Sequence, residues 1–451
     1  MSQLRRWFSL VAVLALVLAA CGDGDAGDTT TPGADTTGAA DTTEAADTTQ
    51  PMAEGEVEVV WVRGADHPEG QAFLEVLAGF TAATGYEVNY QGLGDDLPTI
   101  VGTRVEGGDP PDVAVLPQPG LLRSLAQRGD LVAASQGVID GMAANFAPVW
   151  TDLGSVDGTL YGVYFKADNK SLIWYDIGVF GDLAITDPAS WDELIATSQN
   201  LVDNGFAALA VAGADGWTLS DLFEDVYART AGADLYDQLT NHEIPWTHDS
   251  VKEALAVIDE LTGQPGVVAG GADGALQMGF VDAIVAVAGG DAVMVKGQSA
   301  VATIAQEEAG AVAGTDIAFF PFPSIEGSPN TVLGGGDVAV ALTDNPGAQA
   351  LLEYLTTAEA VESWASIGGF VSPNQNLDLS VYPDDVSRGI AEGLVGAEVF
   401  VFDMSDLIGA PLGATTGAGI WGQLQNWLGN PDDVDAILEQ LEQEAEAHYS
   451  Q

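Results

Sequence analysis

The stretch GGDPPDVAVLPQPGLLRSLAQRGDL, residues 107–131, indicates the fold class, because two kinds of regular structure follow one another directly in it. PDVAVLP, residues 111–117, is a short apolar run between prolines, which favours a buried strand. GLLRSLAQRGDLV, residues 120–132, then resumes a helix. The stretch therefore predicts a strand followed by a helix, which is the repeating unit of an α/β sheet.

The same alternation extends along the chain on both sides of this stretch. We expect strands at residues 56–64, 86–92, 158–166, 171–176, 291–298, 316–324 and 336–342. We expect helices at residues 69–85, 96–108, 191–205, 220–232, 250–264, 346–369 and 431–448. This order predicts an α/β fold with mostly parallel sheets and with ligands at the carboxyl ends of the strands. The ~395 residues beyond position 55 are too many for one core, so we expect two lobes.

The first 20 residues have the pattern of a secretory signal. Arg5 and Arg6 precede an apolar run of about twelve residues, which is too short to span a bilayer comfortably. Leu18-Ala19-Ala20-Cys21 resembles the bacterial lipobox, in which cleavage precedes the cysteine and its thiol receives a diacylglycerol. The alternative is an ordinary signal peptide with an incidental cysteine. Because Cys21 is the only cysteine, the chain forms no internal disulfide.

Residues 21–55 have the composition of a disordered tether. The unit Asp-Thr-Thr recurs four times, and the segment has no aromatic residue and almost nothing to bury. DGDAGD, from Asp23, has a faint likeness to a calcium loop, but Ala34 stands where the twelfth-position carboxylate belongs. We therefore expect a spacer between the membrane anchor and the folded part of the chain.

The charge of the chain excludes several partners. Asp and Glu number 67 against 12 Lys and Arg, which gives a net charge of −55. Such a surface repels nucleic acid and anionic lipid, so we expect no phosphate-backbone binding. Because the acidic residues are spread along the chain, they suggest adaptation to high salt, where counterions screen the self-repulsion. Drift of a GC-rich genome toward Ala, Gly and Asp would give the same composition.

Several stretches together resemble the extracellular solute-binding proteins of sugar ABC transporters, in particular the alpha-glucoside-type and maltose-binding-protein-like members. They are residues 107–131, DGTLYGVYFKADNKSLIWYD, SWDELIATSQNLVDNG, GADGWTLSDLFED, FFPFPS, GGGDVAVAL and TTAEAVESWASIGGFVSPN. The resemblance implies a two-lobed periplasmic-binding-protein-like fold of class II. It places residues 56–163 and 325–370 in an N-terminal lobe and residues 164–324 and 371–451 in a C-terminal lobe. The hinge crossings would fall near 161–166, 319–322 and 369–371.

The function implied by this resemblance is transport. The chain would be a monomeric, lipid-anchored component of an ABC importer, at the outer face of the cell membrane. It would capture an oligosaccharide, such as the alpha-glucosides maltose or trehalose, by lobe closure, and deliver it to the permease transmembrane subunits. It would need no cofactor and no metal, and it would not be an enzyme. The alternatives are the same fold with a non-sugar solute, such as a polyamine or peptide, a chemosensor without a permease, and a glycoside-active hydrolase.

A sugar site needs hydrogen-bonding side chains for the hydroxyls and aromatic rings for the apolar faces. Trp217 and Asp221 are the strongest pair, because the i, i+4 spacing places both on one side of a helix start and matches the family's Gly-Trp-x-x-x-Asp pattern. A core tryptophan and a helix-terminal charge would give the same spacing. The other candidates for ligand binding are Asp66, His67, Gln118, Lys296, Gln298, Asp337, Asp406 and Trp421.

Each of these further candidates has a structural alternative. Asp66 and His67 follow the first strand, but they also suit a turn and a helix start. Asp337 follows three glycines, which would either let backbone approach a ligand or only form a turn. Lys296 could face the ligand or form an ion pair on an acidic surface.

Motifs for catalysis are weak. GQSAV, residues 297–301, lacks the final glycine of the G-x-S-x-G pattern. The four histidines, at 67, 242, 248 and 448, have no zinc-site spacing. Carboxylate pairs for glycoside cleavage depend on their separation in space, which the sequence does not give.

Overall fold

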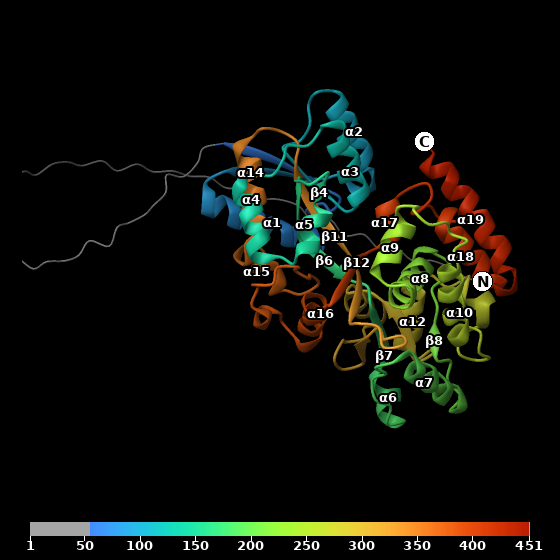
Figure 1. The fold of residues 1–451 in the computed structure, drawn as a ribbon. Helices are drawn as coiled ribbons and strands as arrows, with labels where there is room; N and C mark the ends of the chain where they lie inside the picture. Colours follow the sequence, from blue (N-terminus) through green and yellow to red (C-terminus); the bar gives the residue numbers. More distant parts are fainter. Residues whose placement is uncertain (1–54, 451) are drawn as a thin grey trace, which may run out of the picture. The chain divides into compact units, whose positions relative to one another are not determined.

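The structure is a computed structural model that describes residues 55–450, drawn as the coloured ribbon in Figure 1. The expected signal peptide (1–20), Cys21 and the tether (21–55) lie outside the described residues, except for Gly55. The described residues all belong to one compact unit. No helix within residues 55–450 combines the length and the apolar character needed to cross a membrane.

The strands within the described part form two larger sheets and one hairpin. The strands are β1 (Glu56–Trp61), β2 (Glu87–Gly92), β3 (Val113–Leu116), β4 (Ser155–Val156), β5 (Thr159–Leu160), β6 (Gly162–Asn169), β7 (Leu172–Asp176), β8 (Leu209–Ala210), β9 (Met294–Gly297), β10 (Ile317–Pro321), β11 (Thr331–Ala341) and β12 (Val399–Phe402). The six-stranded sheet has the order β12-β11-β3-β1-β2, with β6 also paired to β11. The four-stranded sheet has the order β10-β7-β9-β8, and β4 pairs with β5.

The helices surround these sheets. Those that pack around the six-stranded sheet or follow its strands are α1 (Pro68–Thr84), α2 (Leu97–Glu106), α3 (Pro119–Arg128), α4 (Gln136–Asn145), α5 (Pro148–Leu153), α14 (Pro346–Leu355), α15 (Ala358–Ala365) and α16 (Asp385–Val395). The others are α6 (Ile177–Asp182), α7 (Trp191–Asp203), α8 (Trp217–Thr230), α9 (Ala233–Thr240), α10 (Asp249–Thr262), α11 (Gly271–Ala275), α12 (Phe280–Gly289), α13 (Val301–Ala309), α17 (Met404–Ile408), α18 (Gly419–Gly429) and α19 (Val434–Tyr449). Short 3-10 turns are η1 (Gly94–Asp96), η2 (Leu379–Val381) and η3 (Pro431–Asp433).

The local signals explain the element ends that the sequence predicts best. Helix α1 begins after His67, whose ring nitrogen accepts a hydrogen bond from the N–H of Glu69, and it ends at Gly85 with φ 87°. A left-handed residue at this position is typical of glycine. Helix α7 begins with a capping box between Ser190 and Glu193. Residues 56–64, 111–117 and 191–205 therefore contain the expected strands and helix, with ends shifted by a few residues.

The six-stranded sheet is mixed, whereas the sequence predicted mostly parallel sheets. Strand β1 pairs in parallel with β2 and β3, and β11 pairs in parallel with β12. Strand β11 runs antiparallel to both β3 and β6. The physical reason is that β11 enters the sheet after the chain has returned from the second sheet, and not after a crossover helix on the same sheet. The expectation of mostly parallel pairing was wrong for β11, and it was also wrong for β7, which runs antiparallel to both β10 and β9 in the four-stranded sheet.

The chain passes twice between the two sheets, and it leaves the six-stranded sheet a third time for helices α17–α19, which pack in the second core. It leaves β6 for β7 at residues 170–171, leaves β10 for β11 at residues 322–330, and leaves β12 for α17 at residue 403. We call these residues the three crossing segments. The lobe boundaries stay a prediction, with one adjustment: β12 lies in the range expected for the C-terminal lobe but pairs with β11 in the six-stranded sheet. Val371, near which a crossing was expected, instead forms a bridge with Ala167 of β6.

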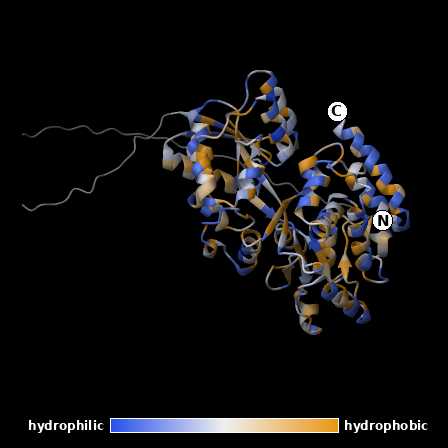
Figure 2. Ribbon diagram, in the orientation of Figure 1, coloured by the Kyte–Doolittle hydropathy of each residue, from blue (hydrophilic) through white to orange (hydrophobic). Residues whose placement is uncertain are grey.

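Apolar side chains of the strands form the cores of both halves. Strand β3 is buried at every position, as expected for a strand covered on both faces. One core cluster centres on the six-stranded sheet and includes Trp61, Phe73 and Trp364, and a second includes Phe223 and Trp246. Figure 2 shows strand segments mainly in hydrophobic colours and the outward side of α19 in hydrophilic ones. These cores fix the strand ends from which the site residues project.

Candidate functional site

Helix α8 places the two strongest sequence candidates at one end. Trp217 is its first residue, and its ring lies edge-on to Phe280 at 4.8 Å. Gly216, which precedes it, has φ 79°, and a Cβ there would lie 2.8 Å from Cβ of Trp421. Glycine is needed at this position both for the backbone conformation and for the close approach of α18. Trp421 is thereby brought next to the start of α8.

The α18 helix is held against this loop by a second contact. Nε2 of Gln425 donates hydrogen bonds of 2.9 Å to the carbonyl oxygens of Gly213 and Ala214. The indole N–H of Trp421 is buried and has no hydrogen-bond partner among the described residues. A buried donor without a partner is unfavourable.

Lys170 and Lys296 are paired with carboxylates of α8. Nζ of Lys170 lies 3.3 Å from Oδ1 of Asp221, and it also contacts Oδ2 of Asp403. Nζ of Lys296 lies 3.6 Å from Oδ2 of Asp221 and 3.2 Å from Oδ2 of Asp225. The ammonium of Lys170 lies 6.0 Å from the centre of the Trp217 ring, within reach of a cation–π contact. Asp221 is therefore shared between two lysines beside an aromatic ring.

Burial governs the protonation of this cluster. Burial raises the pKa of Asp221 to about 6, against the opposing effects of Lys170 and Lys296. Burial raises the pKa of Asp406 to about 7, and the carboxylate of Asp403 adds to the shift. For Asp403, burial also acts upward, but the Lys170 ammonium and the hydrogen bonds that Asp403 accepts outweigh it, and its pKa is about 2. The cluster thus holds carboxyl groups of very different acidity close together.

A second group of charges lies at the end of β1 and on β11. The carboxylate of Asp337 accepts hydrogen bonds from Nε1 of Trp61 at 3.2 Å and from Nζ of Lys166 at 2.9 Å. Lys166 also lies 3.2 Å from Oε1 of Glu69. Burial acts to lower the pKa of Lys166, but Asp337 and Glu69 outweigh it and raise the pKa above its usual value. Asp337 is placed at a register shift between β11 and β6.

The glycines before Asp337 serve packing within the sheet. A Cβ at Gly334 would lie 2.6 Å from the carbonyl oxygen of Asp168, and one at Gly336 would lie 2.7 Å from that of Lys166. These glycines lie inside β11 and not in a turn. They let β6 approach closely, which brings Lys166 to Asp337.

The other predicted residues lie at the borders of these two groups. The side chain of Asp66 is exposed and has no hydrogen bond or ion pair among the described residues, whereas His67 caps α1 beside Glu69. Gln118 is half-buried and is the N-cap residue of α3, and this helix packs on α17, which carries Asp406. Gln298 is half-buried after β9, two residues beyond Lys296.

The structure therefore brings Trp217, Asp221, Lys296, Trp421 and Asp406 into one region. The pKa of Asp406 responds to the charges of Lys170 and Asp221 in the first group and of Asp337 in the second. The structure does not give Asp66 or Gln298 any contact with that region.

Sequence reasoning missed several members of these groups: Trp61, Glu69, Lys166, Lys170, Glu224, Asp225 and Asp403. The rarity of lysine in the sequence could have identified the lysines of these groups. The chain has only four lysines, and three of them, Lys166, Lys170 and Lys296, belong to these two groups. No comparable sequence signal marks the carboxylates of these groups, because acidic residues are abundant throughout the chain.

Among the described residues, the hydroxyl of Ser299 in GQSAV contacts neither a histidine nor a carboxylate side chain. This hydroxyl contacts the backbone of Asn169, accepting from the N–H at 3.1 Å. The contacts of His67, His242 and His248 are with Glu69, Glu442 and Ser250. Within residues 55–450 no group of three or more His, Cys, Asp or Glu side chains is arranged to hold a metal ion.

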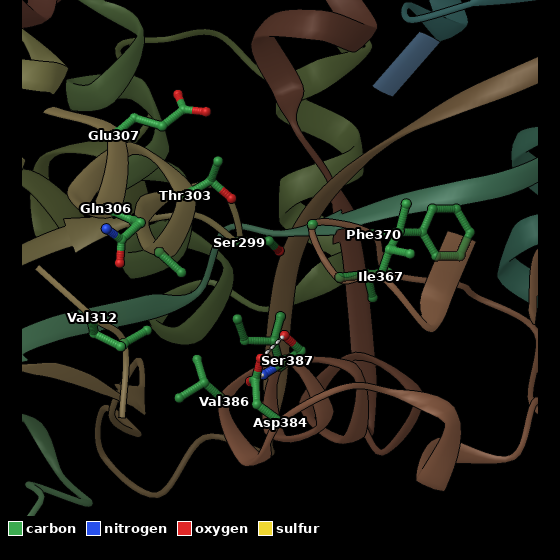
Figure 3. A pocket seen from close by; sticks show the side chains of 15 residues that line it. Ser299, Thr303, Gln306, Glu307, Val312, Ile367, Phe370, Asp384, Val386 and Ser387 are labelled. Carbon is green, nitrogen blue, oxygen red and sulfur yellow. Dashed lines mark hydrogen bonds between the residues drawn. The ribbon is translucent and has the colours of Figure 1, made fainter. Parts of the chain in front are cut away.

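A cavity of about 340 Å³ lies away from these charges. It is lined by α13, the segment before Val371 and α16, and Figure 3 shows Thr303, Ile367 and Ser387 among its walls. Ser387 donates to Asp384 at 3.2 Å there. This cavity contains none of the predicted ligand-binding residues, so the candidate site is defined by its chemistry and contacts and not by this hollow.

Comparisons with known proteins agree with this organisation. The family described as "Bacterial extracellular solute-binding protein" matches residues 75–389. The osmoprotective compounds-binding protein GgtB of Synechocystis sp. is 34% identical over 373 residues, which are 80% of this chain and 86% of that protein. The alpha-glucosides-binding periplasmic protein AglE of Rhizobium meliloti is 32% identical over 379 residues, 80% of this chain and 81% of that protein.

Solved structures show the same fold. The bacterial solute receptor AcbH, described as having an exclusive preference for β-D-galactopyranose, superposes with a TM-score of 0.74 and 21% identity over 88% of this chain and 99% of that one. RafE of Streptococcus pneumoniae superposes with a TM-score of 0.71 and 19% identity over 87% and 97% of the two chains. The predicted two-lobed α/β fold with hinge-crossing segments is confirmed.

Proposed function

This chain belongs to the bacterial extracellular solute-binding proteins, and from that premise we propose that it captures an oligosaccharide, an alpha-glucoside such as maltose or trehalose, for an ABC importer. Its family consists of extracytoplasmic proteins that bind a solute for transport and are not enzymes. The AglE relative is named for alpha-glucosides, which supports this ligand class. Capture would occur by closure of the two lobes, followed by docking to permease subunits.

The pairing of every lysine in the site carries this proposal. Lys166, Lys170 and Lys296 each have carboxylate partners, so none is free to neutralise an anionic solute. The Asp221 carboxylate lies one helical turn beyond the Trp217 ring, and such a pair suits a neutral sugar, because a carboxylate accepts hydrogen bonds from hydroxyl groups and a ring packs on apolar faces. We assign ligand contact to Trp217, Asp221, Asp406 and Trp421. We place Gln118, Lys296 and Asp337 at the edge of the binding site.

An osmoprotective solute is the second candidate. The GgtB relative is named for osmoprotective compounds, and a chain of net charge −55 has the composition of a protein that works in high salt. A neutral polyhydroxylated osmoprotectant would make the same contacts as a small sugar.

Anchoring and location complete the proposal. We assign Cys21 as the lipidated residue, with residues 22–55 as a spacer, so that the monomeric binding domain stays at the outer face of the membrane. In cells fed a labelled fatty acid, the expressed full chain should become labelled and its Cys21→Ser variant should not. Equal labelling of the two proteins would contradict the anchor.

The ligand class can be tested by thermal unfolding with a panel of solutes. Ligand present at a hundred times its dissociation constant stabilises the folded state by about 2.7 kcal/mol. We expect stabilisation by maltose or trehalose, and none by spermidine or a tripeptide. Stabilisation by spermidine alone would overturn the sugar assignment while leaving the family and the fold intact.

A further inference from the structure

Helix α8 carries a continuous charged face that is buried inside the protein. Asp221, Glu224, Asp225 and Arg229 are at most 7% exposed. Their spacing places all four along one side of the helix. Burying four charged groups is costly unless each finds partners, so the partners identify what this face is for.

The first crossing segment is held by two of these residues. Asp221 pairs with Lys170, and Oδ1 of Asp225 accepts a hydrogen bond from the hydroxyl of Ser171. The same hydroxyl accepts a hydrogen bond of 2.7 Å from the N–H of Leu333 on β11. Ser171 therefore joins α8 to the strand that follows the second crossing segment.

The second crossing segment is held at both of its ends by Arg229. Nη2 of Arg229 donates to the carbonyl oxygen of Thr331 at 2.5 Å and lies 3.4 Å from that of Phe322. Nη1 donates to Oδ1 of Asp225 at 2.8 Å, which fixes the guanidinium. A planar guanidinium with several donors suits this fork of two carbonyl groups.

The third crossing segment is held by Glu224. Its Oε2 accepts hydrogen bonds from the N–H of Met404 at 2.6 Å and from the hydroxyl of Tyr236 at 2.7 Å. The Tyr236 hydroxyl lies 2.9 Å from the carbonyl oxygen of Phe402. The first two crossing segments also bind one another, since the N–H of Phe322 donates a hydrogen bond of 2.8 Å to the carbonyl oxygen of Ser171. The third segment binds β11, since the N–H of Asp403 donates a hydrogen bond of 2.8 Å to the carbonyl oxygen of Gly334.

We propose that the buried charged face of α8 positions the hinge, so that ligand contact at the start of α8 is transmitted through this one helix to all three crossing segments. This inference rests on the proposed function, because it takes the ligand to lie at the start of α8. Arg229 lies 12 residues beyond Trp217, which is about 18 Å along a helix. Glu224, Asp225, Arg229 and Ser171 are thus positioning residues that set the lobe angle without touching the ligand.

The matched variants are Ser171→Ala and Ser198→Ala. Both remove the hydroxyl of a buried serine, but the Ser198 hydroxyl has no hydrogen-bond partner among the described residues. It lies about two turns along α7 from Trp191, the residue at which that helix contacts the second crossing segment. A third variant, Arg229→Lys, keeps the positive charge beside Asp225 but removes the fork to Phe322 and Thr331. If Ser171→Ala does not fold, Arg229→Lys alone tests whether α8 positions the hinge.

Two measurements on the mature protein test the proposal. Small-angle X-ray scattering without ligand reports the distribution of lobe separations, and calorimetric titration with maltose and trehalose reports affinity. We expect Ser171→Ala and Arg229→Lys to change the scattering curve and to weaken sugar binding about tenfold, because apparent affinity falls with the fraction of binding-competent molecules. We expect Ser198→Ala to match the unaltered protein in both.

The two proposals fail in different ways. If neither sugar binds the unaltered protein, the ligand assignment fails, and the ligand-free scattering of the variants still decides whether α8 positions the hinge. If folded Ser171→Ala and Arg229→Lys give the same scattering curve as Ser198→Ala, the role of α8 is overturned, whatever binds.

Discussion

The indole N–H of Trp61 donates a hydrogen bond of 3.2 Å to Asp337, although 276 positions separate the two residues in the chain. Lys166 occupies the other carboxylate oxygen. Asp337 is therefore held by the protein on both sides, and we expect its main contribution to be stability at the junction of β1, β6 and β11.

Replacing Asp337 by Asn should destabilise the protein by about 1–3 kcal/mol, because a buried charged donor loses its partner. The loss of unfolding free energy is limited because Lys166 still has its ion pair with Glu69, at 3.2 Å. Urea unfolding of the mature domain measures it. Asp435→Asn is the control, since Asp435 is 75% exposed in its pair with Lys252 and such surface pairs contribute about 0–1 kcal/mol. Equal destabilisation by both changes would contradict the account.

Replacing Trp217 by Ala should weaken sugar binding more than replacing it by Phe, because Phe keeps an aromatic ring beside Phe280. An aromatic contact contributes about 0.5–1.5 kcal/mol beyond area burial, so we expect a loss of several-fold or more for Ala. Titration with maltose and trehalose measures it. Identical affinities of the Ala and Phe variants would show that the ring does not contact the sugar.

The carboxyl group of Asp406 should make the folded protein less stable as pH rises from about 4 to about 7. Its pKa is raised to about 7 in the folded state and is about 4 in an unfolded chain, so the folded state binds the proton more tightly in this window. The contribution of Asp406 to the free energy of unfolding is therefore greatest below about pH 4, and it is lost as pH rises to about 7.

Comparing the unaltered protein with Asp406→Asn by urea unfolding at several pH values isolates this effect from the other acidic residues. The difference in unfolding free energy between the two proteins should shift in favour of the Asn variant as pH rises through the window. A difference that does not change between pH 4 and pH 7 would contradict the environment described for Asp406.

Salt should stabilise the protein strongly. With a net charge of −55, self-repulsion destabilises the compact state, and ions screen it over about 10 Å at 0.1 M and about 3 Å at 1 M. Thermal unfolding in dilute buffer and in molar KCl measures the effect. A melting temperature that stays constant or falls in molar KCl would contradict the expected relief of charge repulsion.

The sequence predicted the fold better than the site, for physical reasons that particular residues illustrate. Strand β3 and helices α1 and α7 follow from local patterns and caps that need no distant partner. Strand β12 and its pairing with β11 were missed, because a four-residue strand has a weak local pattern and its place depends on a distant segment.

In the site, too, the sequence predicted residues that are neighbours on one helix and missed those that meet from distant segments. Trp217 and Asp221 were found from their spacing on one helix. Lys170 and Asp403 were missed because they meet from segments 233 positions apart. The buried position of Glu224 and Asp225 could not be inferred from a helix whose charged residues look like those of a solvated face.

The central claim is that a neutral sugar binds at the start of α8, and isothermal titration of the mature domain with maltose and trehalose tests it most directly. We predict saturable binding of at least one of them by the unaltered protein, and binding weakened at least about tenfold in Asp221→Asn, since hydrogen bonds to charged groups contribute about 1.5–3 kcal/mol. Binding of full affinity by folded Asp221→Asn, or no binding of either sugar to the unaltered protein, would contradict it.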